Sequence, residues 1–108
     1  MEAICLEVVK WKSKNKVVDE MMIKAASNIV IDLKNCEGFI QQVLCKNSLG
    51  EWVAVYYWKN EECAHASNEY MADKEAFINL MALVDVDSVS IETMMSVQAS
   101  GGIDFDSI

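Results

Sequence analysis

Residues 36–58 read CEGFIQQVLCKNSLGEWVAVYYW and predict a β-hairpin. Two runs rich in β-branched and aromatic residues flank the polar segment 46–50, which is typical of two strands joined by a tight turn. Gly50 can adopt the left-handed backbone conformation that such a turn needs. We expect the rest of the chain to be built around this hairpin.

Helices are expected on both sides of the hairpin. Before it, apolar residues at helical spacing predict one amphipathic helix of about five turns, which Asn15 caps and which ends near Asn35. After it, Asn60 is the expected N-cap of a second helix. Asp73 offers a further cap, so we expect this second helix to divide at a bend near Ala72.

Strand-like alternation before and after these helices completes the order βαββαβ. Residues 3–11 and 88–98 alternate with the period of a strand. This order predicts an α+β, ferredoxin-like fold with a four-stranded antiparallel sheet and both helices on one face. We expect a single domain over residues 1–98 and a C-terminal tail over residues 99–108.

The two faces of the predicted sheet differ in composition. We expect the helices to cover the purely apolar series, which comprises Ile4, Leu6, Val8, Val53, Val55, Tyr57, Val89, Ile91 and Met95. The opposite face would then carry polar and aromatic side chains, among them Glu7, Trp52, Tyr56, Trp58, Glu92 and Met94. The orientation of the second strand stays open. An aromatic face of this size normally needs a partner, so we expect two copies of the chain to pack face to face as a homodimer.

Composition argues against several classes of function. The net charge is −8 and all nine basic residues are lysines, so nucleic acid is not an expected partner. The first residues lack the basic start and long apolar run of a signal peptide, and no apolar stretch approaches membrane-spanning length. We therefore expect a cytoplasmic protein with no membrane partner. Zinc-ligand spacing and glycine-rich phosphate loops are absent from the sequence, so neither a metal nor a cofactor is predicted.

The order of the elements, together with Gly38-Phe39-Ile40, residues 53–58 (VAVYYW) and residues 60–64 (NEECA), resembles the antibiotic biosynthesis monooxygenase-like family. The resemblance covers about residues 3–98. It implies a dimeric α+β barrel that binds an aromatic polyketide, a quinone or haem. In several members it also implies oxidation of the substrate by molecular oxygen without metal or flavin.

The residues that match the family are chiefly architectural. Trp58 matches the tryptophan at the end of the third strand, and Gly38-Phe39 matches the start of the second. The haem-degrading branch has a tryptophan and a histidine in the helices that follow. Here Tyr70 and Met71 take the place of the tryptophan and residues 77–81 contain no histidine, so haem degradation is not expected.

Glu7 and Glu92 are the candidate catalytic pair, because carboxylates on neighbouring strands can share a proton and act as general acid and base. The alternative for both is a hydrogen bond at the rim of the sheet. His65 is the only histidine, and its neutral pKa suits a general base if it faces a cleft. The alternative for His65 is a solvent-facing position, because it lies off the apolar stripe of its helix.

Trp52, Tyr56, Trp58 and Met94 are the candidate ligand-binding residues, since they could stack on a flat aromatic or quinone-like molecule. A set of aromatic side chains on one face of a sheet is more often the core of a dimer, which is the interpretation we favour for these residues. Two functions therefore stay open. One is a dimeric barrel that binds a flat apolar molecule and oxidises it with O2 without a cofactor. The other is a non-catalytic ligand-binding or assembly module whose interior is filled by its own side chains.

Overall fold

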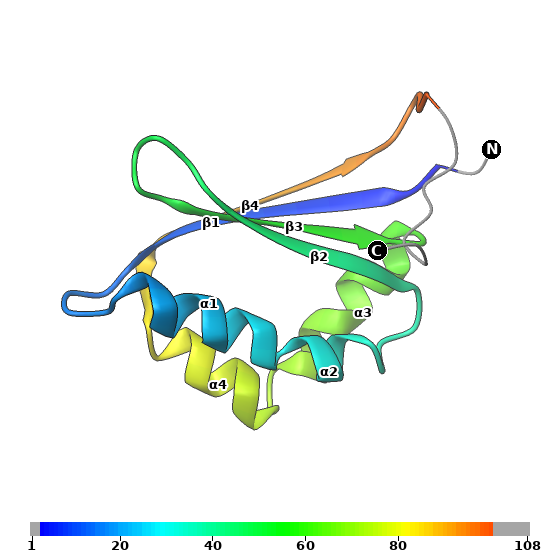
Figure 1. Cartoon of the computed structure of the whole chain (residues 1–108). Helices are drawn as coiled ribbons and strands as arrows, with labels where there is room; N and C mark the ends of the chain where they lie inside the picture. The colour runs from blue at the N-terminus through cyan, green and yellow to red at the C-terminus, as the bar shows by residue number, and fades with distance from the viewer. Residues whose placement is uncertain (1–2, 101–108) are drawn as a thin grey trace.

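A computed structural model describes residues 3–100, in which one antiparallel sheet lies over a layer of helices (Figure 1). The elements in chain order are β1 (Cys5–Ser13), α1 (Asp19–Asn28), α2 (Val30–Leu33), β2 (Phe39–Lys46), β3 (Trp52–Trp58), α3 (Glu61–Met71), α4 (Glu75–Met81) and β4 (Val84–Met95). Most of the predicted tail over 99–108 lies outside the described residues. Within the described part of the chain, no helix is long and apolar enough to cross a membrane.

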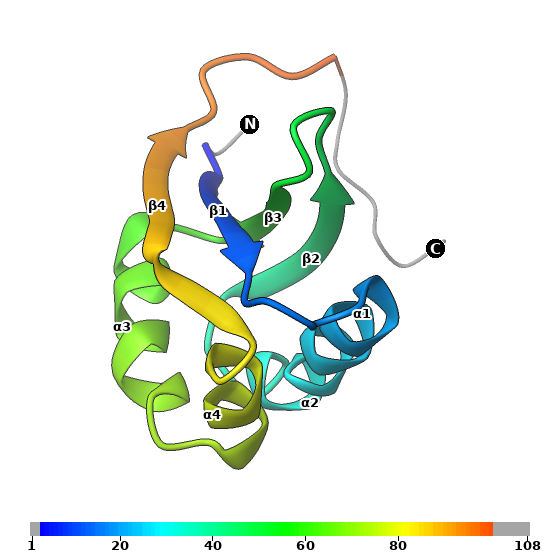
Figure 2. The same ribbon diagram turned by 90° about the vertical axis from the view of Figure 1, so that its left-hand side faces the viewer.

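The sheet has the strand order β2-β3-β1-β4, and each neighbouring pair is antiparallel. β1 and β3 are therefore the central strands, and the helices cover one face of the sheet (Figure 2). This arrangement confirms the predicted ferredoxin-like α+β fold. A β-bulge shifts the pairing of β1 with β4 between Lys10 and Lys12.

The predicted hairpin is present as β2 and β3. Its turn is held by Asn47, whose side-chain oxygen accepts hydrogen bonds from the backbone N–H groups of Leu49 and Glu51, both at 3.0 Å. Gly50 has a φ of +79°, a left-handed conformation that residues with a side chain rarely adopt. The left-handed Gly50 confirms the turn residue predicted from the sequence, and the hydrogen bonds of Asn47 are a further finding of the structure.

The first predicted helix is divided and begins later than expected. Ile29 separates α1 from α2, where one continuous helix was predicted. Val18 occupies the N-cap position of α1 and its side chain makes no cap, so the prediction of Asn15 as the cap is wrong. The reason is the turn before the helix, where Lys16 takes a φ of +71° and keeps the chain out of the helical conformation.

The second predicted helix agrees better with the structure. Asn60 Oδ1 accepts a hydrogen bond from the backbone N–H of Cys63 at 2.8 Å, which confirms it as the N-cap of α3. The break between α3 and α4 confirms the bend near Ala72. The predicted cap at Asp73 is wrong, because the extended residue before α4 is Lys74 and no side chain caps that helix.

The structure reverses the predicted assignment of the faces of β1 and β3. Directly paired residues of antiparallel strands point to the same face, and Glu7 pairs with Tyr56 while Trp11 pairs with Trp52. Trp11, Trp52 and Trp58 are at most 4% exposed, because this face packs against the helices. The aromatic rings bury more apolar area than the aliphatic series does, which favours this choice of covered face.

The open face carries the aliphatic series instead. Its residues on the central strands are only partly buried, and they are Leu6, Val8, Val53, Val55 and Tyr57. On β4 the prediction holds, since Val89 and Ile91 lie on the covered side with Val9. The predicted alternation of each strand was therefore correct. The prediction of which side the helices cover was wrong for β1 and β3.

Candidate functional site

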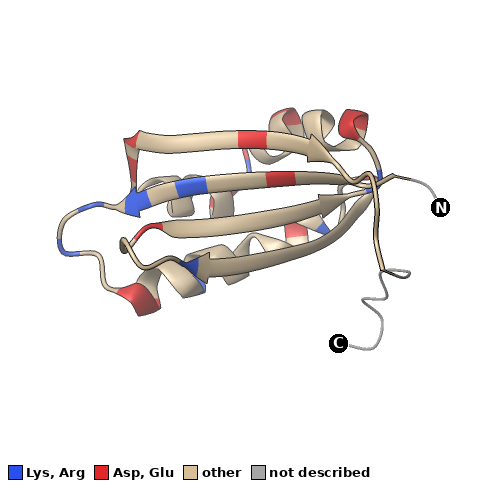
Figure 3. Cartoon of the chain, turned by 90° about the horizontal axis from the view of Figure 1, so that it is seen from above, with Lys and Arg blue, Asp and Glu red and all other residues tan. Residues whose placement is uncertain are grey.

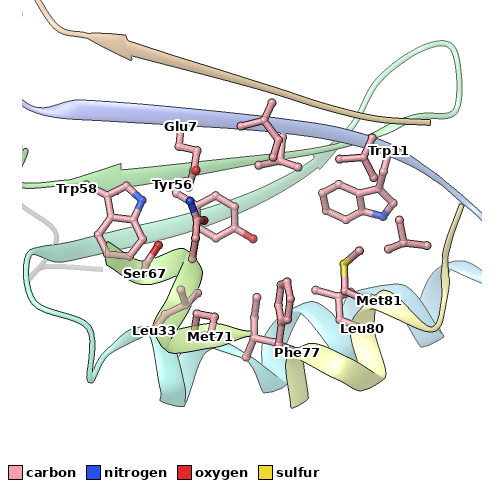
Figure 4. A pocket seen from close by; sticks show the side chains of 16 residues that line it. Glu7, Trp11, Leu33, Tyr56, Trp58, Ser67, Met71, Phe77, Leu80 and Met81 are labelled. Carbon is pink, nitrogen blue, oxygen red and sulfur yellow. The ribbon is translucent and has the colours of Figure 1, made fainter. Parts of the chain in front are cut away.

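A cavity of about 270 Å³ lies between the sheet and the helices of the described chain (Figure 4). β1, β3 and β4 line it on the sheet side, and the helices form its floor. Most of its lining is apolar, with helical side chains that include Leu33, Met71, Phe77, Leu80 and Met81. The cavity lies within a single copy of the chain, on the face that the helices cover. From the sequence, Glu7, Tyr56 and Trp58 were expected on the opposite face.

Polar groups gather at one end of the cavity. Figure 4 shows Glu7, Tyr56, Trp58 and Ser67 toward this end, while Trp11 lies toward the other. The pairing of β1 with β3 places Glu7 directly opposite Tyr56. The cap at the start of α3 fixes the helix that brings Ser67 beneath them. We call these four residues, Glu7, Tyr56, Trp58 and Ser67, the polar end.

Glu7 is the carboxylic acid whose pKa this environment changes. Burial raises the pKa of Glu7 above its ordinary value of 4.5, because an ionised carboxylate is poorly solvated in an apolar cavity. The indole N–H of Trp58 and the charge of His65 lower the pKa and offset part of this rise. Glu7 is thus a weaker acid than a solvated glutamate, and its carboxylate is correspondingly a stronger base.

Tyr56 and Ser67 contribute hydroxyl groups of different availability. Burial raises the pKa of Tyr56, and the nearby carboxylate of Glu7 adds to the rise, so this hydroxyl keeps its proton. Ser67 is buried, and its hydroxyl donates to the backbone oxygen of Ala64 at 2.6 Å. The Ser67 proton is therefore already used in a hydrogen bond within α3. Tyr56 is then the hydroxyl of the polar end that can donate to a ligand.

The predicted carboxylate pair is not formed. Glu92 pairs with Val8, whereas Glu7 pairs with Thr93, so Glu7 and Glu92 point to opposite faces of the sheet. The prediction that they are neighbours on one face is therefore wrong. Met94 also lies on the open face, opposite Leu6, and does not line the cavity.

Two further candidates lie outside the cavity. Trp52 is buried on the covered face, but its indole N–H donates to Ser13 Oγ at 2.9 Å and the ring does not line this cavity. His65 has a side chain 64% exposed, with Nε2 3.3 Å from Glu61 Oε1 on the surface of α3. His65 therefore faces solvent, which was the alternative to its role as a general base. Of the candidates, Glu7, Tyr56 and Trp58 are brought together.

Sequence reasoning missed the floor of the cavity. Ser67, Asn68 and Met71 come from α3, and Phe77 and Met81 come from α4. The available signal in the sequence was Ser67, a polar residue among the small residues of α3. Among residues 3–100, no group of three or more His, Cys, Asp or Glu residues could hold a metal ion.

Comparison with known proteins bears on the fold. The chain matches no protein-family model and no curated protein. It superposes on SnoaB, a cofactor-independent oxygenase from Streptomyces nogalater, with a TM-score of 0.69 and 10% identity over 94% of this chain and 100% of that one. A candidate antibiotic biosynthesis monooxygenase from Chloroflexus aurantiacus gives 0.65 and 12% identity over 91% and 97%. Protein SO0527 from Shewanella oneidensis gives 0.61 and 20% over 86% and 90%. The chain has the antibiotic biosynthesis monooxygenase-like fold.

Proposed function

We propose that the chain binds a flat, apolar small molecule in the cavity between the sheet and the helices. The observation that carries this proposal is the apolar cavity of about 270 Å³ with polar groups at one end. An apolar cavity of roughly 150 Å³ can hold benzene, so this one suits a ligand of about two fused rings. A few polar groups in an apolar pocket are typical of small-molecule sites.

The cavity argues against an interior filled by the protein's own side chains. That alternative predicts no internal space, whereas Glu7 and Tyr56 border an open volume. A non-catalytic ligand-binding module is still a valid second candidate, because a cavity alone implies binding and no reaction. The two candidates differ in whether the bound molecule reacts with O2.

The proposed reaction is oxidation of a bound phenol-like molecule by O2, with Glu7 as the general base. For 1-naphthol, Glu7 takes the hydroxyl proton and the electron-rich ring reacts with O2 at the carbon para to that oxygen. One oxygen atom stays on the ring, and the other leaves as water with the two hydrogens that the substrate loses. One 1-naphthol and one O2 thus give one 1,4-naphthoquinone and one water, and Glu7 is returned to its starting state. The raised pKa of Glu7 supports this role.

Oxygen uptake and quinone absorbance with 1-naphthol test the reaction. Glu7→Gln keeps the size of the side chain and removes the base, so the rate should fall at least about a hundredfold. Glu92→Gln is the matched control, because Glu92 is an exposed glutamate on the other face of the same sheet. An undiminished rate in Glu7→Gln would remove Glu7 from the mechanism. Binding without oxygen uptake would identify the non-catalytic module.

We further propose that the open face of the sheet pairs with a second copy of the chain. Helices cover the other face (Figure 2). The open face presents aliphatic side chains on β1 and β3. Seen from above, most of the length of the strands is neither acidic nor basic (Figure 3). Lys10 and Glu92 are charged residues on the open face. A largely apolar face left open by the helices suits the interface of a symmetric dimer.

Native mass spectrometry of Val55→Lys tests the dimer. Val55 lies between Val8 and Val43 at the centre of the open face, so a buried lysine there should give a monomer. Ile31→Lys is the control, because Ile31 is 71% exposed on α2, away from this face. A dimer that persists in Val55→Lys but not in Ile31→Lys would place the interface elsewhere.

A further inference from the structure

The three tryptophan indoles of the described chain differ in their hydrogen bonding. Trp11 Nε1 donates to Met22 Sδ at 3.4 Å, and Trp52 Nε1 donates to Ser13 Oγ at 2.9 Å. Trp58 Nε1 is buried and forms no well-aligned hydrogen bond with any described residue. Buried N–H groups are paired in most proteins, because an unpaired one loses its hydration without compensation. The exception here is the indole that borders the polar end of the cavity.

Trp58 is held firmly in this position. The residue is 1% exposed, and its ring packs edge-to-face against Phe39 with centroids 5.4 Å apart. The N–H lies close enough to Glu7 to lower the pKa of the carboxyl group, yet the two do not form a well-aligned bond. The ring cannot easily turn, so the acceptors within reach of its N–H are the poorly aligned Glu7 carboxylate and a molecule in the cavity.

Within residues 3–100, the side chains that line the cavity include an acidic one but no basic one. Among the described residues that line it, Glu7 is the only one that carries a charge at neutral pH, and no lysine or histidine is present. An anionic ligand would find no counter-cation and would lie beside a carboxylate. A ligand with a neutral oxygen acceptor would instead satisfy the N–H of Trp58 and meet no charge repulsion.

We propose that the cavity selects apolar molecules that carry a neutral hydrogen-bond acceptor, with the Trp58 N–H as the donor that positions them and Glu7 as the residue that rejects anions. This inference rests on the proposed ligand-binding function and adds the chemical class of the ligand. It assigns Trp58, whose match to the family is architectural, a direct contact with the ligand.

Three ligands with the same ring system separate the effects of the apolar ring, of a neutral acceptor and of a negative charge on affinity. Naphthalene has no acceptor, 2-acetylnaphthalene has a neutral carbonyl, and 2-naphthoate has nearly the same shape with a negative charge. Each is titrated into 15N-labelled protein at pH 7.5, and the indole N–H signals are followed by NMR. Trp52 is an internal control, because its indole is hydrogen-bonded and does not line the cavity.

The carbonyl ligand should bind roughly tenfold more tightly than naphthalene, because it satisfies a buried donor. It should also move the Trp58 N–H signal downfield, while naphthalene causes only a ring-current shift and Trp52 stays in place. 2-Naphthoate should bind at least about tenfold more weakly than the ketone at this pH. Glu7→Gln should recover much of the naphthoate affinity, and Glu92→Gln should recover none.

Equal affinities for the ketone and the carboxylate, or binding of the ketone without a downfield shift of Trp58, would overturn the inference. Either result leaves an apolar ligand-binding cavity intact, because naphthalene still binds. Failure of naphthalene itself to bind would contradict the proposed function and, with it, this inference. Naphthoate affinity unchanged in Glu7→Gln would show that Glu7 does not exclude anions.

Discussion

Alanine variants of Gly38 and Gly50 test how closely the chain just before β2 approaches α3. Both glycines are left-handed, with φ of +80° and +79°. A Cβ on Gly38 would lie 2.5 Å from Cys63 Sγ and 2.8 Å from Cys63 Cβ, whereas a Cβ on Gly50 would meet nothing within 4 Å. The approach at Gly38 is fixed by a 2.8 Å hydrogen bond from the N–H of Lys59 to the Gly38 oxygen. The two alanine variants therefore share a backbone penalty and differ in sterics.

Gly50→Ala should lower the free energy of unfolding by about 1 kcal/mol, through the strain of a left-handed alanine. Gly38→Ala carries the same strain and adds an overpacking penalty, for a total loss of about 2–4 kcal/mol. The sulfur of Cys63 can rotate away, but its Cβ is fixed to α3, so Cys63→Ala should recover only part of the loss.

Urea unfolding followed by circular dichroism measures these differences. All variants are compared at one protein concentration, because the proposed dimer would make the measured stability depend on concentration. Equal losses for Gly38→Ala and Gly50→Ala would refute the close approach of Gly38 to α3. Full recovery in the Gly38→Ala, Cys63→Ala double variant would show that the sulfur alone causes the clash.

Three other perturbations follow from single contacts. Glu7 has a raised pKa, so its protonated form stabilises the fold below the ordinary pKa of 4.5, and this contribution is lost as the pH rises through the folded-state pKa. Glu7→Gln should therefore melt at a higher temperature than wild type at pH 7, with a gap that closes near pH 4; a gap that widens on acidification would contradict this. Asn60→Ala should lose about 1 kcal/mol of cap energy in urea unfolding, while Asn15→Ala, which removes no cap, should lose little; equal losses would argue against the cap. Lys46→Gln should cost less than about 1 kcal/mol in the same assay, because its ion pair with Asp19 is exposed; a larger loss would mean that its contact with the ring of Trp52 matters more.

Elements that depend on neighbours in sequence were predictable. The hairpin followed from turn residues and alternation within 36–58, and the cap at Asn60 followed from the residues beside it. The order βαββαβ then left few ways to arrange four strands, so the ferredoxin-like sheet was predicted correctly. The helix start was predicted wrongly at Asn15, because a left-handed Lys16 is not a feature of the local pattern.

The covered face and the site depend on tertiary contacts. A strand's period of two separates its residues into two sets but does not say which set faces the helices, and here both sets are largely apolar. The register of β1 with β4 pairs residues that are far apart in sequence. This register places Glu92 on the face of the sheet opposite to that of Glu7. The cavity needs the helices α3 and α4 beneath Tyr56 and Trp58. The sequence by itself therefore determined the strands, the turn and their order, while only the tertiary structure decided which side chains enclose a common space.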